Sequence, residues 1–526
     1  MKSLLHCIVH HRRLAIAALL LAAPLSVSAR DYFYVSNNKT VTILQYVGTD
    51  QAITIPATID GLPVTGIGAS SFLDLTNLTS VTIPGSVSTI GREAFKGCSN
   101  LTSLDLHEGL SGIGDGAFSQ CASLTNLVVP NSVVYVGMSA FSQCTGLMSL
   151  QIGDFSSDAT VAASISSGAF MGCSNLVSVV IGNSVQALDL ILFSGCDRLK
   201  RIVIGDHVSE IPPNEFSGLP SLEEVVIGGR VRTIGSAAFR GCPEIGTVRI
   251  PGNVGSIDAS AFEQCTGLTT LLLDPGVGHV GTSAFSNCTS LASVDIPGSV
   301  ATIDASAFAG CSALKIVVMN EGVANLGQGV FRNCPELASV TIPGSLKTIA
   351  PFGFAGFAHL TDVKIGNGIT DLGAFCFNNC AGLTNITIPA SVKAIQVDAL
   401  VGCTNLTSVF FIGNAPTVQE LAFESSVTVY YQTNTTGWGP VLGGRPTQPW
   451  RMPPQLTVVD IGMHLNQFGF IFSGNKDLVI VVEACTNLAV PVWQPVQTNA
   501  LTEGLSFLSD PHSAEFSSRF YRFRAQ

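Results

Sequence analysis

Phenylalanine recurs along this chain at an almost constant spacing, and this period limits what the chain can fold into. Successive copies are 23 residues apart, except for one interval of 29 residues between Phe141 and Phe170. Self-similarity at such a period is typical of a solenoid, in which each repeat forms one coil and packs on its neighbours. The recurring position, which we call the anchor, is occupied by Phe72, Phe95, Phe118, Phe141, Phe170, Phe193, Phe216, Phe239, Phe262, Phe285, Phe308, Phe331, Phe354, Phe377, Leu400 and Phe423.

Other positions repeat with the anchor and predict how each coil is built. Apolar residues nine and eleven positions after the anchor, such as Val81 and Ile83, alternate as in a strand with one buried face. A Pro or Gly then predicts a turn. Residues 86–90 are typical of a second short strand, and residues 91–98 of a single helical turn. The predicted fold class is therefore a mainly β solenoid whose 23-residue coils consist of strand, turn, short strand and helical turn.

The position three residues after the anchor is cysteine in twelve copies. In a secreted chain, so many cysteines could indicate disulfides. However, the position also accepts Leu75, Leu219 and Phe357, and cysteines of successive coils would point the same way, so buried thiols acting as small apolar side chains are favoured. The predicted interior column includes Phe95, Phe118, Phe141, Phe239, Phe262, Phe285, Phe308, Phe331, Cys98, Cys121, Cys144, Cys265, Cys288, Cys311 and Cys334.

The chain divides into five predicted parts. Residues 1–29 have the positive start, apolar stretch and small-residue cleavage site of a secretory signal, and the apolar stretch is too short for a membrane anchor. Cleavage would remove three basic residues and change the net charge from −11 to −14, which argues against nucleic acid as a partner. We expect an N-terminal β cap (30–63), the repeats (64–431), a linker (432–455) and a C-terminal β-sandwich (456–526).

The repeats resemble the BspA-like leucine-rich repeat family of bacterial surface antigens. The family pattern Cys-x-x-Leu-x-x-Val-x-Ile-Pro-x-x-Val-x-x-Ile-Gly-x-x-Ala-Phe is matched almost throughout by residues 98–118 and 288–308. The resemblance implies a right-handed solenoid that is secreted or displayed at the cell surface, and adhesion in some members. It implies no catalytic residue and no cofactor, and we expect a monomeric solenoid.

The open face of the long strand, formed by the residues eight and ten positions after the anchor, is the candidate contact surface. It is mostly small and hydroxylated, as a solvated face would be. The middle coils differ, because basic residues gather there beside apolar ones and could bind an unknown protein or glycan. Alternatively, Glu223 and Glu224 could pair with Arg201 across strands. The candidate residues are Arg201, Glu224, Arg249, Val203, Val226, Arg230 and Arg232.

No catalytic motif accompanies this surface. The chain has no Gly-x-Ser-x-Gly, no His-Glu-x-x-His, no phosphate-binding loop and no paired-cysteine zinc motif, so we expect no enzyme and no metal site. Two functions remain open. One is a secreted recognition scaffold for protein or glycan, and the other is a structural envelope or matrix spacer that presents the C-terminal part.

The C-terminal part, residues 456–526, alternates like a series of short strands. It resembles modules on secreted proteins of environmental bacteria such as Verrucomicrobia, on the basis of residues 482–487, 510–511 and 519–522. Surface retention, secretion sorting and carbohydrate binding through Trp493 are its possible roles, and Trp493 could equally be a core residue.

Overall fold

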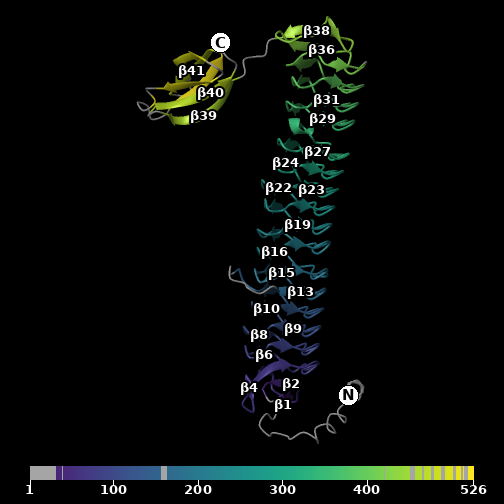
Figure 1. The fold of residues 1–526 in the computed structure, drawn as a ribbon, viewed down its shortest axis with the longest axis vertical. Coiled ribbons are helices and arrows are strands. Elements are labelled where there is room, and N and C mark those ends of the chain that lie inside the picture. Colours follow the sequence, from purple (N-terminus) through teal and green to yellow (C-terminus); the bar gives the residue numbers. More distant parts are fainter. Residues whose placement is uncertain are drawn as a thin grey trace.

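The computed structural model describes residues 31–37, 39–155, 163–419, 421–450, 456–464, 467–474, 479–486, 492–501, 505–510, 513 and 519–525. Over the repeats it is a solenoid whose coils stack in one column (Figure 1). The predicted secretory signal lies outside the described residues. Within them, no helix has the length and apolar character needed to cross a bilayer.

Each coil contributes one long strand, and most consecutive long strands pair in parallel at equivalent positions, as in Ser80 opposite Ser103, with the ladder interrupted at four places in the described residues. Because alternate side chains point to opposite faces of a sheet, Val81 and Ile83 are buried while Ser80 and Thr82 lie on the open face. The long strands are β6 (Ser80–Ile83), β8 (Ser103–Leu106), β10 (Asn126–Val129), β12 (Ser149–Ile152), β14 (Ser178–Ile181), β16 (Arg201–Ile204), β18 (Glu224–Val226), β20 (Thr247–Ile250), β22 (Thr270–Leu273), β24 (Ser293–Ile296), β26 (Ile316–Met319), β28 (Ser339–Ile342), β30 (Asp362–Ile365), β32 (Asn385–Ile388), β34 (Ser408–Phe411) and β36 (Thr428–Gln432).

A second, shorter strand follows in each coil, as predicted, and builds a second parallel sheet. These strands are β7 (Thr89–Ile90), β9 (Gly112–Ile113), β11 (Tyr135–Val136), β13 (Ala163–Ile165), β15 (Val185–Leu188), β17 (Glu210–Ile211), β19 (Thr233–Ile234), β21 (Ser256–Ile257), β23 (His279–Val280), β25 (Thr302–Ile303), β27 (Asn325–Leu326), β29 (Thr348–Ile349), β31 (Asp371–Leu372), β33 (Ala394–Ile395) and β35 (Thr417–Val418).

The corner that carries the anchor is a run of turns and not the predicted helical turn. From Ala94 to Cys98, every second N–H group donates to a carbonyl three residues back, whereas from Glu93 to Gly97 the intervening N–H groups donate to the coil above. A helix would need consecutive N–H groups to bond within the coil. Glu93 and Gly97 also have left-handed φ values of 54° and 74°, which a right-handed helix excludes. The prediction of a helical corner was therefore wrong.

Inside the solenoid, equivalent side chains stack on one another. The rings of Phe262, Phe285 and Phe308 are 5.3 Å apart from centroid to centroid and almost parallel, and all three are fully buried. The same column runs from Phe72 to Phe377, and the predicted Phe and Cys residues all belong to one continuous core. Glycine permits the coils to approach closely, because a Cβ on Gly281 would lie 2.8 Å from the carbonyl oxygen of Ile257.

The two ends of the solenoid are covered differently. At the N-terminal end, β1 (Tyr32–Ser36) pairs antiparallel with β2 (Val41–Tyr46), and β3 (Ala52–Thr54), β4 (Thr58–Ile59) and β5 (Leu62–Ile67) extend the sheets. At the other end, β37 (Val441–Leu442) and β38 (Arg445–Trp450) lie in the predicted linker, and β38 pairs with β36. Trp438 stacks on Tyr431 and packs against the core. The predicted linker therefore adds one more strand to the solenoid, up to residue 450. Its aromatic side chain, Trp438, covers the last coil.

The C-terminal part forms two three-stranded antiparallel sheets around their own small core, as a small sandwich. Its strands are β39 (Leu456–His464), β40 (Gln467–Gly474), β41 (Val479–Cys485), β42 (Gln494–Ala500), β43 (Leu505–Asp510) and β44 (Phe520–Ala525). The Arg522 guanidinium lies 4.7 Å from the centre of the half-buried Trp493 ring, so that one face of this ring is covered.

The short-strand sheet is interrupted twice among the described residues. No ladder joins β15 to β17 or β27 to β29, and at both places the corner N–H groups also fail to reach the coil above. The long strands pair across both places, as β16 with β18 and β28 with β30. Both interruptions follow from the sequence, because Pro213 and Pro351 are the two prolines found three positions before an anchor. Proline restricts the backbone conformation of the residue before it, so the corner of that coil cannot approach the coil below as closely as the other corners do.

Candidate functional site

The middle of the open face brings an apolar row together. Val180, Val203 and Val226 occupy equivalent positions on β14, β16 and β18 and lie directly opposite one another in the parallel ladder. Val226 is 41% exposed, whereas Val203 is almost buried between its neighbours. The adjacent row consists of Ser178, Arg201 and Glu224, so that an apolar strip runs beside a charged one.

The basic residues of this face pair with acids one coil further on. The Arg201 Nε lies 2.8 Å from Glu224, the Lys200 Nζ lies 2.6 Å from Glu223, and the Arg249 Nε lies 2.9 Å from Asp274. The structure therefore contains the cross-strand pairing of Arg201 with Glu224 that the sequence offered as the alternative. These pairs are largely exposed, so they add little to stability, and the patch presents charges of both signs.

Two of the predicted face residues lie elsewhere. Arg230 and Arg232 follow β18 in the turn before β19, outside the long sheet, and the Arg232 guanidinium donates to the Asn253 carbonyl oxygen at 3.4 Å. Arg249 lies on β20, which is not joined to β18 by a ladder. The structure thus groups Arg201, Glu224 and the valines, and separates them from the other three arginines.

The cysteine column has a hydrogen-bonding role that its apolar pattern did not reveal. In all twelve coils the thiol lies 3.1–3.5 Å from the carbonyl oxygen of the anchor in the coil below, as Cys98 does with Phe72 at 3.2 Å. All 14 cysteines in the described residues are free and buried. Burial raises the pKa of the Cys98 thiol to about 12 and that of Cys242 to about 11. These thiols are structural and not reactive.

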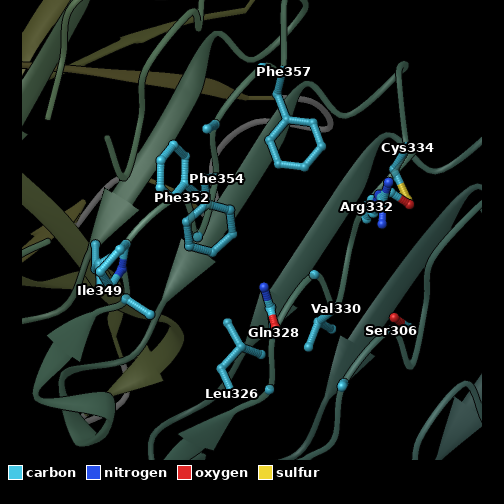
Figure 2. Close-up of a pocket in the computed structure, with 18 of the residues that line it drawn as sticks. Ser306, Leu326, Gln328, Val330, Arg332, Cys334, Ile349, Phe352, Phe354 and Phe357 are labelled. Carbon is cyan, nitrogen blue, oxygen red and sulfur yellow. The ribbon is translucent and has the colours of Figure 1, made fainter. Parts of the chain in front are cut away.

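A hollow lies at the second interruption of the short-strand sheet. It has a volume of about 1270 Å³ and separates two facing segments, 324–334 below and 347–357 above, which we call the seam. Figure 2 shows the rings of Phe352, Phe354 and Phe357 on one side of it and Leu326 and Val330 on the other. The repeat pattern alone does not reveal this site, and its one signal in the sequence is the proline at position 351.

The described residues offer no metal centre. No group of three or more His, Cys, Asp or Glu side chains among them converges in a way that could hold a metal ion. What the site offers is a long ladder of polar and apolar rows and one hollow between coils. Parallel coils of this kind, with a leucine six positions after nearly every anchor, define a leucine-rich repeat solenoid.

The family is shown by sequence comparison. The family model described as BspA type leucine rich repeat region (6 copies) matches residues 65–159, 155–269, 232–351 and 324–435. The matches cover more than half of the chain, and the chain therefore belongs to the BspA type leucine-rich repeat family. No curated protein matches it.

Several solved structures are similar to this chain. A leucine-rich repeat protein from Bacteroides ovatus is 21% identical, covers 78% of this chain and 95% of its own, and has a TM-score of 0.43. A leucine rich cell surface protein from Faecalibacterium prausnitzii is 25% identical over 75% of this chain and 96% of its own, with a TM-score of 0.30. The pneumococcal vaccine antigen PcpA is 20% identical over 81% and 98%, with a TM-score of 0.36.

Proposed function

We propose that this protein is a secreted or cell-surface, non-catalytic scaffold that recognises a protein or a glycan with the open face of its long sheet. The observation that carries the proposal is the pair of adjacent rows on β14, β16 and β18. There an apolar strip of three valines lies beside Arg201 and Glu224, on a surface that the fold itself does not need to cover. Membership of a leucine-rich repeat family supports a binding scaffold.

The mixed charge of this face fits a partner that presents both signs. Arg201 and Glu224 are each about half exposed, so both remain available to a partner while they pair with one another. Rim charges of this kind affect the rate of association and the selectivity more than the total affinity. An apolar centre with a charged margin is also how protein-binding patches are commonly built.

Charge reversal at the face tests this proposal. We expect the double variant Arg201→Glu, Arg249→Glu to bind its partner about tenfold more weakly or worse, because both sites would repel what they now attract. Binding of the chain lacking residues 1–29 would be measured on an array of immobilised extracellular proteins and glycans. Folding should persist, since the exposed pairs broken by the change contribute little to stability.

Arg92→Glu is the matched control, because Arg92 is an exposed arginine (its side chain is 74% exposed) on a corner of the solenoid and away from the long sheet. It should bind as the unmodified chain does. Equal binding by the double variant and the control would contradict the proposal. Such a result, or no binding to any array member, would favour the alternative that the repeats are a spacer presenting residues 456–526.

A further inference from the structure

The seam between segments 324–334 and 347–357 lacks the backbone hydrogen bonds that join most corners of the solenoid, as the first interruption does. Across it, the N–H groups of Gly329, Phe331 and Asn333 have no backbone partner in the coil above, although the equivalent groups of the coil below all do. The carbonyl groups that would accept them, at residues 351, 353 and 355, are likewise without a partner in the coil below. One lip of the hollow is thus a row of donors and the other a row of acceptors.

At the first interruption a side chain reaches across the gap. There the buried carboxyl group of Glu215 accepts the N–H of Leu192 at 3.2 Å and 3.3 Å, and so gives one corner N–H group of the coil below a partner. Gly353 takes the equivalent position at the seam and has no side chain to do this. The seam therefore leaves a hollow of about 1270 Å³ in which polar backbone groups need an external partner.

An aromatic ring lies at the mouth of the hollow. Phe352 is 63% exposed and stacks on Phe375 of the next coil, with ring centres 4.8 Å apart and an interplanar angle of 1°. Both residues have left-handed backbone conformations, φ 57° and 58°, as the equivalent residue does in every coil. They are the two aromatic residues at this repeat position.

The other face of the Phe352 ring is free. In the coil below, the equivalent position is Gly329, which adopts φ 63° and contributes no side chain. The Cβ and Cδ atoms of Arg332 lie 3.5 Å and 3.8 Å from where a Gly329 Cβ would be, so a flat group that continued the stack would pack beside the Arg332 side chain. Gln328 and Arg332 are exposed beside it, and among the described residues neither side chain has a hydrogen bond or ion pair to another side chain.

We propose that the seam is a carbohydrate-binding site in which a sugar ring of a neutral oligosaccharide stacks on the free face of Phe352. Hydroxyl groups both donate and accept, so one sugar can bond the donor lip and the acceptor lip together, which a carboxylate or an ammonium group cannot do. The apolar face of the sugar ring suits the Phe352 ring, and a few convergent polar groups around an apolar wall are typical of small-ligand sites.

An extended peptide also carries both donors and acceptors, but the seam is too narrow to admit one as an added strand. Neighbouring strands lie about 4.8 Å apart, so insertion would need coils roughly 9–10 Å apart. The ring centroids of Phe331 and Phe354, on the two sides of the seam, are 6.3 Å apart. Between Phe72 and Phe331, neighbouring ring centroids of the column are 4.5–5.9 Å apart. The spacing thus favours a ligand at the mouth over a strand between the coils.

The inference rests on the proposed function in that it treats the chain as a recognition scaffold, but it concerns a different face. Binding of neutral cello-, xylo-, manno- and malto-hexaoses to the chain lacking residues 1–29 would be measured by calorimetry. We expect at least one hexaose to bind, and Phe352→Ala to weaken that binding about tenfold through loss of the stacked ring. Phe352→Trp should restore it. Leu421→Ala is the matched control, because Leu421 has the same repeat position, φ 61° and 65% exposure but does not line the seam.

A second variant separates loss of binding from loss of folding. The double change Ala350→Gly, Pro351→Ser installs the residues found at Gly235 and Ser236, where the ladder is intact. It should close the seam, slow amide exchange at Gly329, Phe331 and Asn333, raise the unfolding temperature and abolish sugar binding.

Three outcomes would overturn the proposal: no hexaose binds, Phe352→Ala binds as before, or the closed variant still binds. Binding of the peptide Ac-Val-Thr-Trp-Thr-Val-Thr-NH2 but of no hexaose would also overturn it, in favour of strand addition. None of these results bears on the charge-reversal experiment, so failure at the seam and failure of the open face as a binding surface can be told apart.

Discussion

Replacing Phe285 by alanine should lower the free energy of unfolding by about 3–5 kcal/mol, because the change empties a fully enclosed place in the column. Phe285 is completely buried, and its ring packs between Phe262 and Phe308 at 5.3 Å on each side. A coil can bury its apolar edge only against its neighbours, so the loss affects two coil interfaces at once. Urea unfolding followed by circular dichroism would measure the effect.

Phe352→Ala is the control for this experiment, since it removes the same ring from a site that is 63% exposed. Exposed substitutions usually change stability by no more than about 0.5 kcal/mol, although the Phe352 ring also loses its contact with Phe375. A loss near zero for Phe285→Ala, or an equal loss for both variants, would show that the anchor is not an interior residue.

The buried carboxyl group of Glu215 should make the protein less stable as the pH rises. Burial raises the pKa of Glu215 to about 8 from its ordinary value of 4.5, and the N–H donors of Leu192 and Ile191 offset only part of this. The folded protein therefore binds the proton more tightly than the unfolded chain does. The contribution of Glu215 to stability is greatest below pH 4.5, falls by up to about 1.4 kcal/mol per pH unit between 4.5 and 8, and levels off above that.

Glu215→Gln removes this dependence, because an amide keeps an oxygen acceptor for the Leu192 N–H and never ionises. At pH 9 the variant should be more stable than the unmodified chain by on the order of 4 kcal/mol, whereas at pH 4 the two should be nearly equal. Unfolding midpoints measured from pH 4 to pH 9 would test this. Parallel curves for the two proteins would mean that Glu215 is not buried in its neutral form.

Much of the fold could be predicted because the repeat determines it. The period of 23 residues predicted the coil, and the apolar positions nine and eleven after the anchor predicted the buried face of the long strand. The helical corner could not be excluded in this way, since a short segment with Ala and Phe is compatible with one helical turn. The conformation of the corner is determined by hydrogen bonds to the next coil, which the N–H groups of Glu93, Phe95 and Gly97 donate. The sequence of a single repeat does not reveal these bonds.

The two sites differ in how far the sequence could reveal them. Alternation along the strands predicted which residues share the open face, and the 23-residue offset allowed the pairing of Arg201 with Glu224 to be considered in advance. The seam was missed because it depends on an interruption between coils. Pro351 marks the place, yet Pro213 has the same position at an interruption that the Glu215 side chain reaches across to the Leu192 N–H. Only the packing of the coils distinguishes these two outcomes.

The thiol column offers the most direct test of the central claim, that equivalent residues of every coil stack in one dry interior. In the chain lacking residues 1–29, the account predicts that none of the 14 cysteines reacts with an aromatic disulfide reagent under native conditions, because all are buried, and burial raises the pKa of thiols such as Cys98 and Cys288. All 14 should react in denaturant without prior reduction. Rapid native labelling of several column cysteines, or fewer than 14 free thiols after unfolding, would contradict the account.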